Sequence, residues 1–454
     1  MSGRLLRIEL RRNELLLIFP VVVVLYGFFT WDGVLRHSIL FWADGSIESR
    51  NVIALLGPFS GAVAAWMAGR NRRRGLDELI ATTPRPALGR DLTICAATAI
   101  LGIAAYAAAA VAVLGWTAPR TSWDGPYVSV LIPSLVGIAA MAAVGYPIGR
   151  AFPRRITAIL VGAGLIIAIA LPITLSDSWP RFLSPVGELN ASPWYGIRPG
   201  IAFEQSLFLL GIAYVGLAAV AAASKARRVA LPVLVVAIVT SAIGIGAVRA
   251  GAQDEGKPKL LAYEPVCAGD PVTICVHPAF EGVLDELADR TNTMLAPFAG
   301  LDGVPTRFEQ QAPTLEQVRR NDIPMPAEGE FYIEYPTFTG MIFEALFQIS
   351  DSFLGEPDEP DELDSRDIPV SEARFLVHVT LLESAGYDLT CEDDQVTYEI
   401  DSGFLSSGSA MGFFGIPCEE VDRFTALDPE VRAEWLRQNA AALRAGEIDL
   451  EDLP

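Results

Sequence analysis

The sequence predicts an α-helical polytopic membrane domain of six to seven transmembrane helices, followed by a mostly α (α+β) extracytoplasmic domain. Three observations lead to this fold class. Of the 454 residues, 51% are hydrophobic and 19% are charged, against about 25% charged residues in an ordinary soluble domain. The apolar residues gather in long runs in the first half of the chain. The acidic residues gather in the second half.

The two halves of the chain also differ in net charge. Residues 1–248 hold 21 Lys and Arg against 12 Asp and Glu, a net charge of +9, whereas residues 249–454 hold 13 against 42, a net charge of −29. This polarity excludes a single soluble globule and a disordered chain, and the acidic half would repel nucleic-acid phosphates. We therefore expect a transmembrane domain over residues 1–248, an acidic outer domain over residues 249–454, and no nucleic-acid partner.

Seven stretches of the first half meet or approach the length of about 20 apolar residues that a helix needs to cross a bilayer. None of them contains Asp, Glu, Lys, Arg or His. The first is the shortest, and it follows a basic start as a signal peptide would, but no small-residue cleavage site follows it, so we expect an uncleaved span. The stretches are Leu15–Trp31, Asn51–Gly69, Leu92–Trp116, Val128–Gly149, Thr157–Leu175, Gln205–Ala223 and Ala230–Val248.

Basic residues between the spans predict the orientation of the chain. With the N-terminus in the cytoplasm, 16 of the 21 Lys and Arg residues fall in inside segments and five, Arg50 among them, fall in outside loops. This distribution agrees with the positive-inside rule. Seven spans then place residues 249–454 on the outer face of the plasma membrane.

Four of the five cysteines fall in the predicted outer domain, at Cys267, Cys275, Cys391 and Cys418. An even number of cysteines in an oxidising compartment favours two disulfides. Of three possible pairings we expect the nearest neighbours, Cys267 with Cys275 and Cys391 with Cys418. Four unrelated thiols or a metal site are the alternative, although zinc-type C-x-x-C spacing is absent. Cys95 lies within a span and is expected to be a small buried apolar residue.

Motifs for catalysis are incomplete in this sequence. Residues 251–257 match G-x-x-x-x-G-K, but Pro258 follows where a phosphate-binding loop needs Ser or Thr for magnesium. His277 and His378 lack the H-E-x-x-H spacing of a zinc-binding helix, and the acidic run 356–364 lacks the glycine of a calcium loop. We expect no catalytic residue, metal site or cofactor in this chain, and we expect His277 to pack against a disulfide and to cap a helix.

Helical signals dominate the predicted outer domain, which is long enough to form a core of its own. An apolar stripe at helical spacing indicates its first helix, and an Asp-Pro pair indicates the start of its last one. The predicted helices cover residues 280–295, 340–354, 371–385 and 429–445, and short strands are expected at 331–335 and 395–400.

The loop Arg70–Asp91 between the second and third spans has the most specific pattern of the first half. Leu76, Leu79 and Ile80 stand at i, i+3 and i+4 and form one apolar face of a short helix. The prolines that follow end this helix. A short amphipathic helix between arginines suits docking into the groove of a partner. A basic loop that lies on lipid headgroups is the alternative.

This loop resembles the loop between spans two and three of type-2 ABC transporter permeases, the membrane subunits of ATP-binding-cassette exporters. In that family the segment is the coupling helix that contacts a separate ATPase subunit, which binds ATP and magnesium. The resemblance covers roughly the first 225 residues, and it also implies an amphipathic interfacial helix at the N-terminus and short re-entrant helices within residues 176–204. The matching residues are Gly75, Leu76, Glu78, Leu79, Thr83 and Pro84.

The lack of ionisable groups in the predicted spans argues against proton- and ion-coupled transport, which needs such groups at membrane depth. Together with the loop, it predicts the permease subunit of an ABC exporter, driven by a partner ATPase and assembled as a homodimer or with a second permease. The large acidic domain leaves another class open. In that alternative the chain is a membrane-anchored binding, sensor or peptidase-like module on the outer face, and its spans transport nothing.

Overall fold

The computed structural model of the chain divides into two compact units, which are described separately. Unit 1 comprises Met1–Phe29 and Phe41–Leu261, and unit 2 is formed chiefly by Ala262–Pro454. The residues that the structure describes are 3–13, 15–30, 41–76, 86–175, 179–186, 189, 193–198, 200–254, 261–301, 304–312, 329–332, 338–354, 372–387, 389–392, 395–400, 409–414, 418–445 and 447–454.

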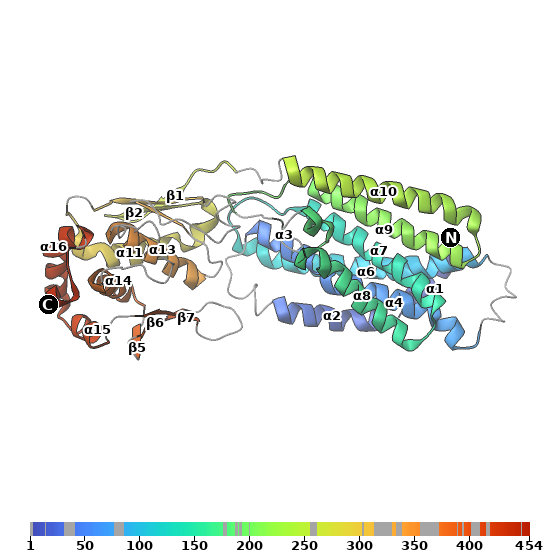
Figure 1. The fold of residues 1–454 in the computed structure, drawn as a ribbon, viewed down its shortest axis with the longest axis horizontal. Helices are drawn as coiled ribbons and strands as arrows, with labels where there is room; N and C mark the ends of the chain where they lie inside the picture. The colour runs from blue at the N-terminus through green and yellow to red at the C-terminus, as the bar shows by residue number, and fades with distance from the viewer. Residues whose placement is uncertain are drawn as a thin grey trace. The chain divides into compact units, whose positions relative to one another are not determined.

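Unit 1 is a bundle of long helices that run side by side (Figure 1). Among the described residues, six helical segments are long and apolar enough to span a membrane: Trp42–Arg73, Ala87–Arg120, Val128–Ala151, Arg155–Thr174, Ile201–Ala223 and Arg227–Ala252. The helices of the unit are α1 (Gly3–Arg11), α2 (Leu15–Thr30), α3 (Trp42–Asn51), α4 (Ile53–Arg73), α6 (Ala87–Thr117), α7 (Ile132–Ala151), α8 (Arg155–Thr174), α9 (Ile201–Ala223) and α10 (Arg227–Asp254), with 3-10 turns η3 (Val128–Leu131) and η4 (Trp179–Leu183).

Helix α2, predicted as the first span, has 16 residues and is shorter than those six segments. It still belongs to the bundle, because Val22 is buried in one cluster with Ile53 and Tyr106. The Tyr26 hydroxyl also donates a hydrogen bond to the Glu48 carboxylate over 3.2 Å. Six of the seven predicted spans therefore have the length of a membrane span, and α2 packs beside them.

The helix that corresponds to the second predicted span begins earlier in the structure than the sequence predicts. Helices α3 and α4 follow one another through a turn at Val52, so the segment begins at Trp42 instead of residue 51. Arg50, which the charge pattern assigns to an outer loop, is 1% exposed. The apolar pattern stops at this charge, but the helix continues because the side chain finds hydrogen-bond partners inside the bundle.

Small residues bring helices α4 and α7 into backbone contact. A Cβ atom added at Gly145 would overlap the carbonyl oxygen of Gly61, and one added at Gly149 would overlap that of Ala65. Gly61, Ala65 and Gly69 recur every four residues along α4, a spacing that lets membrane helices approach closely. Close packing of two backbones thus forms the centre of unit 1.

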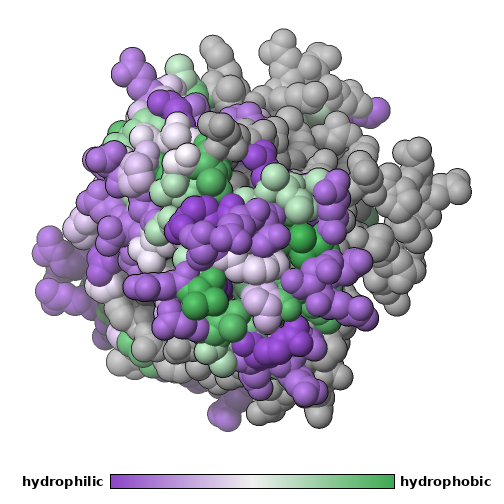
Figure 2. Space-filling model, turned by 90° about the vertical axis from the view of Figure 1, so that its left-hand side faces the viewer, coloured by the Kyte–Doolittle hydropathy of each residue, from purple (hydrophilic) through white to green (hydrophobic). Residues whose placement is uncertain are grey.

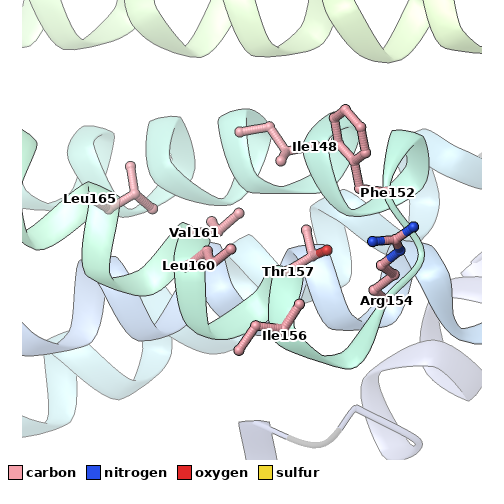
Figure 3. A pocket seen from close by; sticks show the side chains of 9 residues that line it. Ile148, Phe152, Arg154, Ile156, Thr157, Leu160, Val161 and Leu165 are labelled. Carbon is pink, nitrogen blue, oxygen red and sulfur yellow. The ribbon is translucent and has the colours of Figure 1, made fainter.

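Helices α8 and α10 lie at the periphery of unit 1. Of the apolar stretch in α8, 17% is buried, and of the stretch in α10, 11% is buried. The corresponding share for the segment Trp42–Arg73 is 67%. Their outward side chains are largely Ile, Val and Leu, which suit contact with lipid tails. A groove lined by α7 and α8 opens on this surface (Figure 3).

Unit 2 combines helices with two small sheets (Figure 1). The first sheet has the order β1-β2-β3-β4, in which β1 and β2 are antiparallel and the other pairs parallel; the second sheet, β5-β6-β7, is antiparallel. The elements are β1 (Val266–Ala268), β2 (Thr273–Val276), α11 (Glu281–Leu295), β3 (Arg307–Gln310), β4 (Glu330–Phe331), α13 (Phe338–Leu354), α14 (Glu372–Ser384), β5 (Leu389–Glu392), β6 (Gln395–Ile400), β7 (Ser409–Phe414), α15 (Cys418–Thr425) and α16 (Pro429–Ala445).

Large apolar side chains fill the core of unit 2. The four helices predicted in this part of the chain are present as α11, α13, α14 and α16, and the strand predicted at 395–400 is present as β6; of the strand predicted at 331–335, Phe331 lies in β4 and residues 333–335 lie outside the described residues. The face seen in Figure 2 is mostly hydrophilic, with apolar side chains in small separate groups. Among the described residues of unit 2, the large fully buried aromatic side chains are Phe280, Phe298, Phe308, Phe331 and Phe424.

Candidate functional site

The two ends of unit 1 carry different sets of buried polar side chains. Helices α4, α7 and α9 end, and helices α6, α8 and α10 begin, at one end of the bundle. The loop Arg70–Asp91 leaves from this end, which we call the loop end. Helix α3 begins at the other end, which we call the far end.

Gly75 lies in the turn that closes the C-terminus of helix α4. Its φ of +65° lies in the left-handed region. The Gly75 amide donates to the Arg72 carbonyl, and the Leu76 amide donates to the Asn71 carbonyl, each over 3.1 Å. This pair of bonds closes a helix C-terminus, and glycine adopts the required φ without strain. Gly75 therefore has a structural role that its place in the loop motif does not reveal.

The predicted docking helix itself is described in part. Gly75 and Leu76 are within the described residues, and the Leu76 side chain is exposed. The other four residues of the motif, Glu78, Leu79, Thr83 and Pro84, lie outside the described residues.

A buried carboxylate, Asp91, lies in the first turns of α6 at the loop end, where it is 2% exposed. The Tyr146 hydroxyl donates to its Oδ1 over 3.1 Å and the Ser224 hydroxyl donates to its Oδ2 over 2.7 Å. The Arg150 guanidinium forms an ion pair with it. Tyr146 and Arg150 come from α7, and Ser224 directly follows α9. We call these four residues the Asp91 junction, which joins three helices through one carboxylate.

The stability of the Asp91 junction depends on Asp91 keeping its partners. A carboxylate at the edge of a membrane segment is costly unless it is paired. Arg90 also lies 3.9 Å from the Asp91 carboxylate, and a buried ion pair that loses a partner costs about 3–5 kcal/mol where the remaining charge is left unpaired. Helices α6, α7 and α9 are therefore expected to hold fixed positions relative to one another at this end.

Helix α1 is attached to the loop end by two polar contacts. The Arg70 guanidinium lies 3.1 Å from the Glu9 carboxylate, with both side chains mostly buried. The Asn13 amide donates to the Thr98 hydroxyl of α6 over 3.0 Å. The arginines of α1 are exposed and its leucines half-buried, the pattern of an interfacial helix.

The far end holds a second buried charge, Arg50. Its guanidinium donates to the Ser184 carbonyl over 3.1 Å and to Oε1 of Gln205 over 3.4 Å. The Ser134 hydroxyl donates to the Arg50 carbonyl over 3.1 Å. These contacts join α3, α7, α9 and the residue after η4. The resemblance implies re-entrant helices in residues 176–204; among the residues described there, the helical structure is the short 3-10 helix η4 and the first residues of α9.

Sequence reasoning misses both buried charges. Asp91 and Arg50 each lie one residue before a predicted span, so the hydropathy pattern assigns them to loops. One signal was present for Asp91, because it is an acidic residue between the arginines of the most basic loop and a membrane span. Its partners Tyr146, Arg150 and Ser224 are far away in sequence, and no spacing rule connects them.

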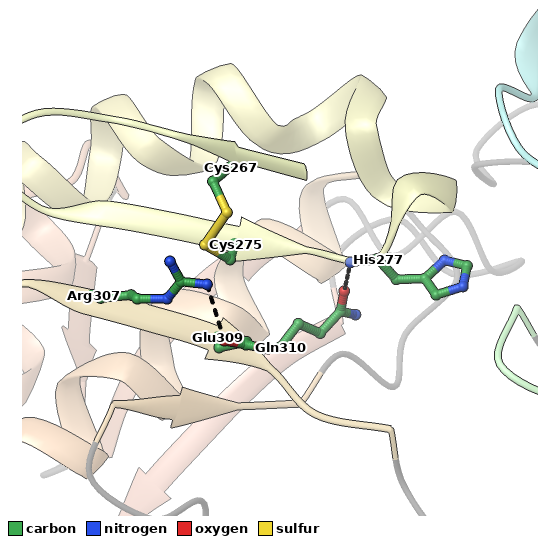
Figure 4. Close-up of a disulfide and its surroundings, with 6 residues drawn as sticks. All are labelled: Cys267, Cys275, His277, Arg307, Glu309 and Gln310. Carbon is green, nitrogen blue, oxygen red and sulfur yellow. Dashed lines mark hydrogen bonds and ion pairs between the residues drawn. A yellow bond between two sulfur atoms is a disulfide. The ribbon is translucent and has the colours of Figure 1, made fainter. Parts of the chain in front are cut away.

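Unit 2 contains the predicted disulfide between Cys267 and Cys275 (Figure 4). The two residues are opposite each other on the antiparallel strands β1 and β2. Cys418, at the start of α15, is also disulfide-bonded, whereas the side chain of Cys391, its predicted partner, lies outside those described. Cys95 is buried and free, as predicted.

His277 caps a short helical turn, as predicted. Its Nδ1 accepts a hydrogen bond from the Ala279 amide over 3.1 Å, and its own amide donates to Oε1 of Gln310 over 2.8 Å (Figure 4). The ring packs against Tyr263, with centroids 4.2 Å apart, and in Figure 4 it points away from the disulfide, so the expected contact with the disulfide is not its main one. Burial lowers the pKa of His277 to about 4.

His378 lies in the core of unit 2, on helix α14. Its ring meets Phe347 edge to face, with centroids 4.2 Å apart, and burial lowers the pKa of His378 to about 3. Within the described ranges, no three His, Cys, Asp or Glu side chains are grouped so as to hold a metal ion. Burial therefore keeps both histidines neutral near pH 7.

The loop end is the candidate functional site of the chain. Its polar groups bond one another and tie five helices together where the predicted docking loop leaves the bundle. Such an arrangement couples the positions of the helices. Comparisons of the chain with known protein families, with curated proteins and with solved structures give no match.

Proposed function

We propose that the chain is the permease subunit of an ATP-binding-cassette exporter, which moves its substrate with ATP hydrolysed by a separate ATPase subunit. The observation that supports this best is the place where the loop leaves the bundle. It leaves α4 at Gly75, at the same end where the Asp91 junction joins α6, α7 and α9. A partner docked on the loop would act where several helices are bonded together.

Polar contacts connect the start of the loop to other helices. The Arg70 guanidinium pairs with Glu9 of α1. The Arg72 guanidinium donates to the Arg150 carbonyl of α7 over 3.5 Å, and Arg150 pairs in turn with Asp91 of α6. A movement of the loop would therefore reach α1, α6 and α7 without direct contact between those helices and the ATPase.

The composition of the long helices supports an external source of energy. The charged residues described in the six long segments lie within nine residues of a segment end, whereas ion-coupled transporters carry such groups at membrane depth. Between the two ends, the Ser60 hydroxyl bonds to its own helix, donating to the Leu56 carbonyl over 2.7 Å.

In the proposed orientation the loop end faces the cytoplasm and unit 2 lies outside the plasma membrane. The arginine-rich loop end supports this through the positive-inside rule. The disulfide between Cys267 and Cys275 supports it as well, because disulfides persist in oxidising compartments. We expect the permease to assemble as a homodimer or with a second permease.

Affinity purification of the full-length protein in mild detergent tests this proposal. A nucleotide-binding subunit should co-purify, and Leu76→Asp should abolish its binding because it places a charge on the apolar face that docks. Glu78→Arg should weaken binding by reversing a charge of the same helix. Val128→Asp is the matched control, since Val128 is exposed at the far end, and it should retain the partner.

Two results would exclude the proposed function. One is the absence of any nucleotide-binding subunit from the purified complex. The other is equal retention of that subunit by Leu76→Asp and by the Val128→Asp control.

A further inference from the structure

A groove of about 420 Å³ lies between the last turn of α7 and the first half of α8 (Figure 3). Arg154 lies at one end of the groove, near the Thr157 hydroxyl, and Leu165 lies at the other end. The rest of the lining is apolar and includes Ile148, Phe152, Ile156, Leu160 and Val161.

The length of the groove corresponds to one leaflet of a bilayer. Its lining follows α8 from Ile156 to Leu165, a rise of about 13 Å at 1.5 Å per residue. Half of the hydrocarbon core of a bilayer is about 15 Å thick. An acyl chain that begins at the end marked by Arg154 would therefore stay in contact with the groove over most of its leaflet.

The groove opens onto the surface of unit 1 that suits lipid. Helix α8 is one of the two peripheral helices, and the side chains of Phe152, Ile156 and Leu160 are all more than half exposed. Large apolar side chains with this exposure are stable next to hydrocarbon and unfavourable in water. The natural occupant of such a groove is an apolar chain from the bilayer.

A positive charge marks the mouth of the groove. Arg154 is exposed, and in the part of the chain that the structure describes it takes part in no ion pair. Arg150, one helical turn earlier, is by contrast paired with Asp91. No side chain caps the start of α8, so the amide groups there add to the preference for an anion. The mouth is thus suited to a phosphate group.

Gly164 leaves open space beside the inner part of the groove. A Cβ atom added at this position would meet nothing within 4 Å. A glycine inside a helix costs about 1 kcal/mol relative to alanine, and at this position the unit itself gains no close packing in return. A larger side chain here would occupy the groove without disturbing the helices, which makes the position useful for a test.

We propose that this groove binds one acyl chain of an anionic phospholipid, whose phosphate is held by Arg154. The inference requires that α8 lies in a membrane, and it does not depend on a transport activity. The acyl chain would fill the space between α7 and α8, and the phosphate would lie at the loop end, at the level of the other arginines.

Native mass spectrometry of the full-length protein, with added phosphatidylglycerol or phosphatidylcholine of identical acyl chains, tests the proposal. The wild-type protein should retain one phosphatidylglycerol about tenfold more strongly than phosphatidylcholine, because the choline ammonium offsets the charge of the phosphate that both lipids carry. Arg154→Ala should reduce phosphatidylglycerol to the level of phosphatidylcholine. Gly164→Leu should reduce the retention of both lipids, because it fills the groove.

Two matched controls separate the groove from general effects. Arg155→Ala removes the neighbouring charge, which does not line the groove. Gly246→Leu places the same side chain on the peripheral helix α10, again with nothing within 4 Å. Both should bind lipid as the wild type does.

Three results would overturn the proposal. The first is equal retention of the two lipids by the wild type. The second is unchanged retention in Arg154→Ala or in Gly164→Leu. The third is a loss of equal size in the controls, which would show that basic charge or helix surface alone determines binding.

Discussion

Unit 1 and unit 2 depend on opposite uses of side-chain size. At the contact between α4 and α7, the side chain is reduced to a hydrogen at Gly61 and Gly145 so that the backbones meet. In unit 2, five buried phenylalanines fill the core. Water drives large apolar side chains into a core, whereas lipid gives no such drive, and membrane helices associate through close packing instead. Enlarging a side chain should therefore disrupt the centre of unit 1, whereas shortening one should disrupt the centre of unit 2.

Enlarging a residue at the centre of unit 1 is expected to have the largest effect. In Gly145→Leu the new side chain would overlap backbone atoms of Gly61, which cannot rotate away, so we expect α4 and α7 to separate and unit 1 to lose its folded form. Size-exclusion chromatography and thermal unfolding of the detergent-solubilised protein would measure this. Gly246→Leu, in open space on α10, is the control and should behave as the wild type. A normal elution profile and melting temperature for Gly145→Leu would contradict the role assigned to small residues.

Replacing a large buried side chain at the centre of unit 2 with a small one should have the next largest effect. Phe308 is fully buried in β3, where it pairs with Ile274 of β2. Phe308→Ala should lower the free energy of unfolding of unit 2 by about 3–5 kcal/mol, because it leaves a cavity. Hydrogen exchange of peptides from β2 and β3 in the full-length protein would report the loss. Arg307→Ala, at the exposed neighbouring position, should change it by less than about 0.5 kcal/mol, and a similar loss in both variants would count against the cavity argument.

Acid should weaken unit 2 through its buried histidines. Burial holds the pKa of His277 at about 4 and that of His378 at about 3, whereas an unfolded histidine has a pKa near 6.5. The unfolded state therefore binds a proton between these values and the folded state does not, so stability is complete above about pH 6.5 and falls as the pH decreases. At pH 5 each histidine should cost about 2 kcal/mol relative to pH 8.

Hydrogen exchange of the α14 peptide at pH 5 and pH 8, corrected for the intrinsic pH dependence of exchange, would measure this loss. His378→Leu should lose the share of the pH dependence that belongs to His378. If that variant keeps the full pH dependence, other groups are responsible for it.

The long helices of unit 1 could be predicted because a run of about 20 apolar residues has few stable conformations other than a helix in a membrane or a core. The ends of these helices could not be placed in the same way. A charge ends a hydropathy pattern, but Asp91 and Arg50 remain helical because each finds partners on other helices. Those partners depend on how the helices pack, and packing is not encoded in the local sequence.

The candidate site shows the same limit. The loop motif around Gly75 is visible in the sequence, and so is the suitability of glycine for ending a helix. The Asp91 junction brings together residues from three separate helices, the last of them Ser224, which is 133 positions away from Asp91. In unit 2, by contrast, the disulfide between Cys267 and Cys275 joins neighbours across a hairpin, and local spacing was enough to predict it.

The contact between α4 and α7 also has a consequence for the order of events during synthesis. Gly61 and Gly145 are 84 residues apart, and at 5–20 residues per second a ribosome needs about 4–17 s to pass from one to the other. For that interval the glycine face of α4 has been synthesised and the helix that will cover it has not. Slower translation between these two positions would lengthen the exposure, and a fault at this stage would leave a chain with its helices formed and the central pair still apart.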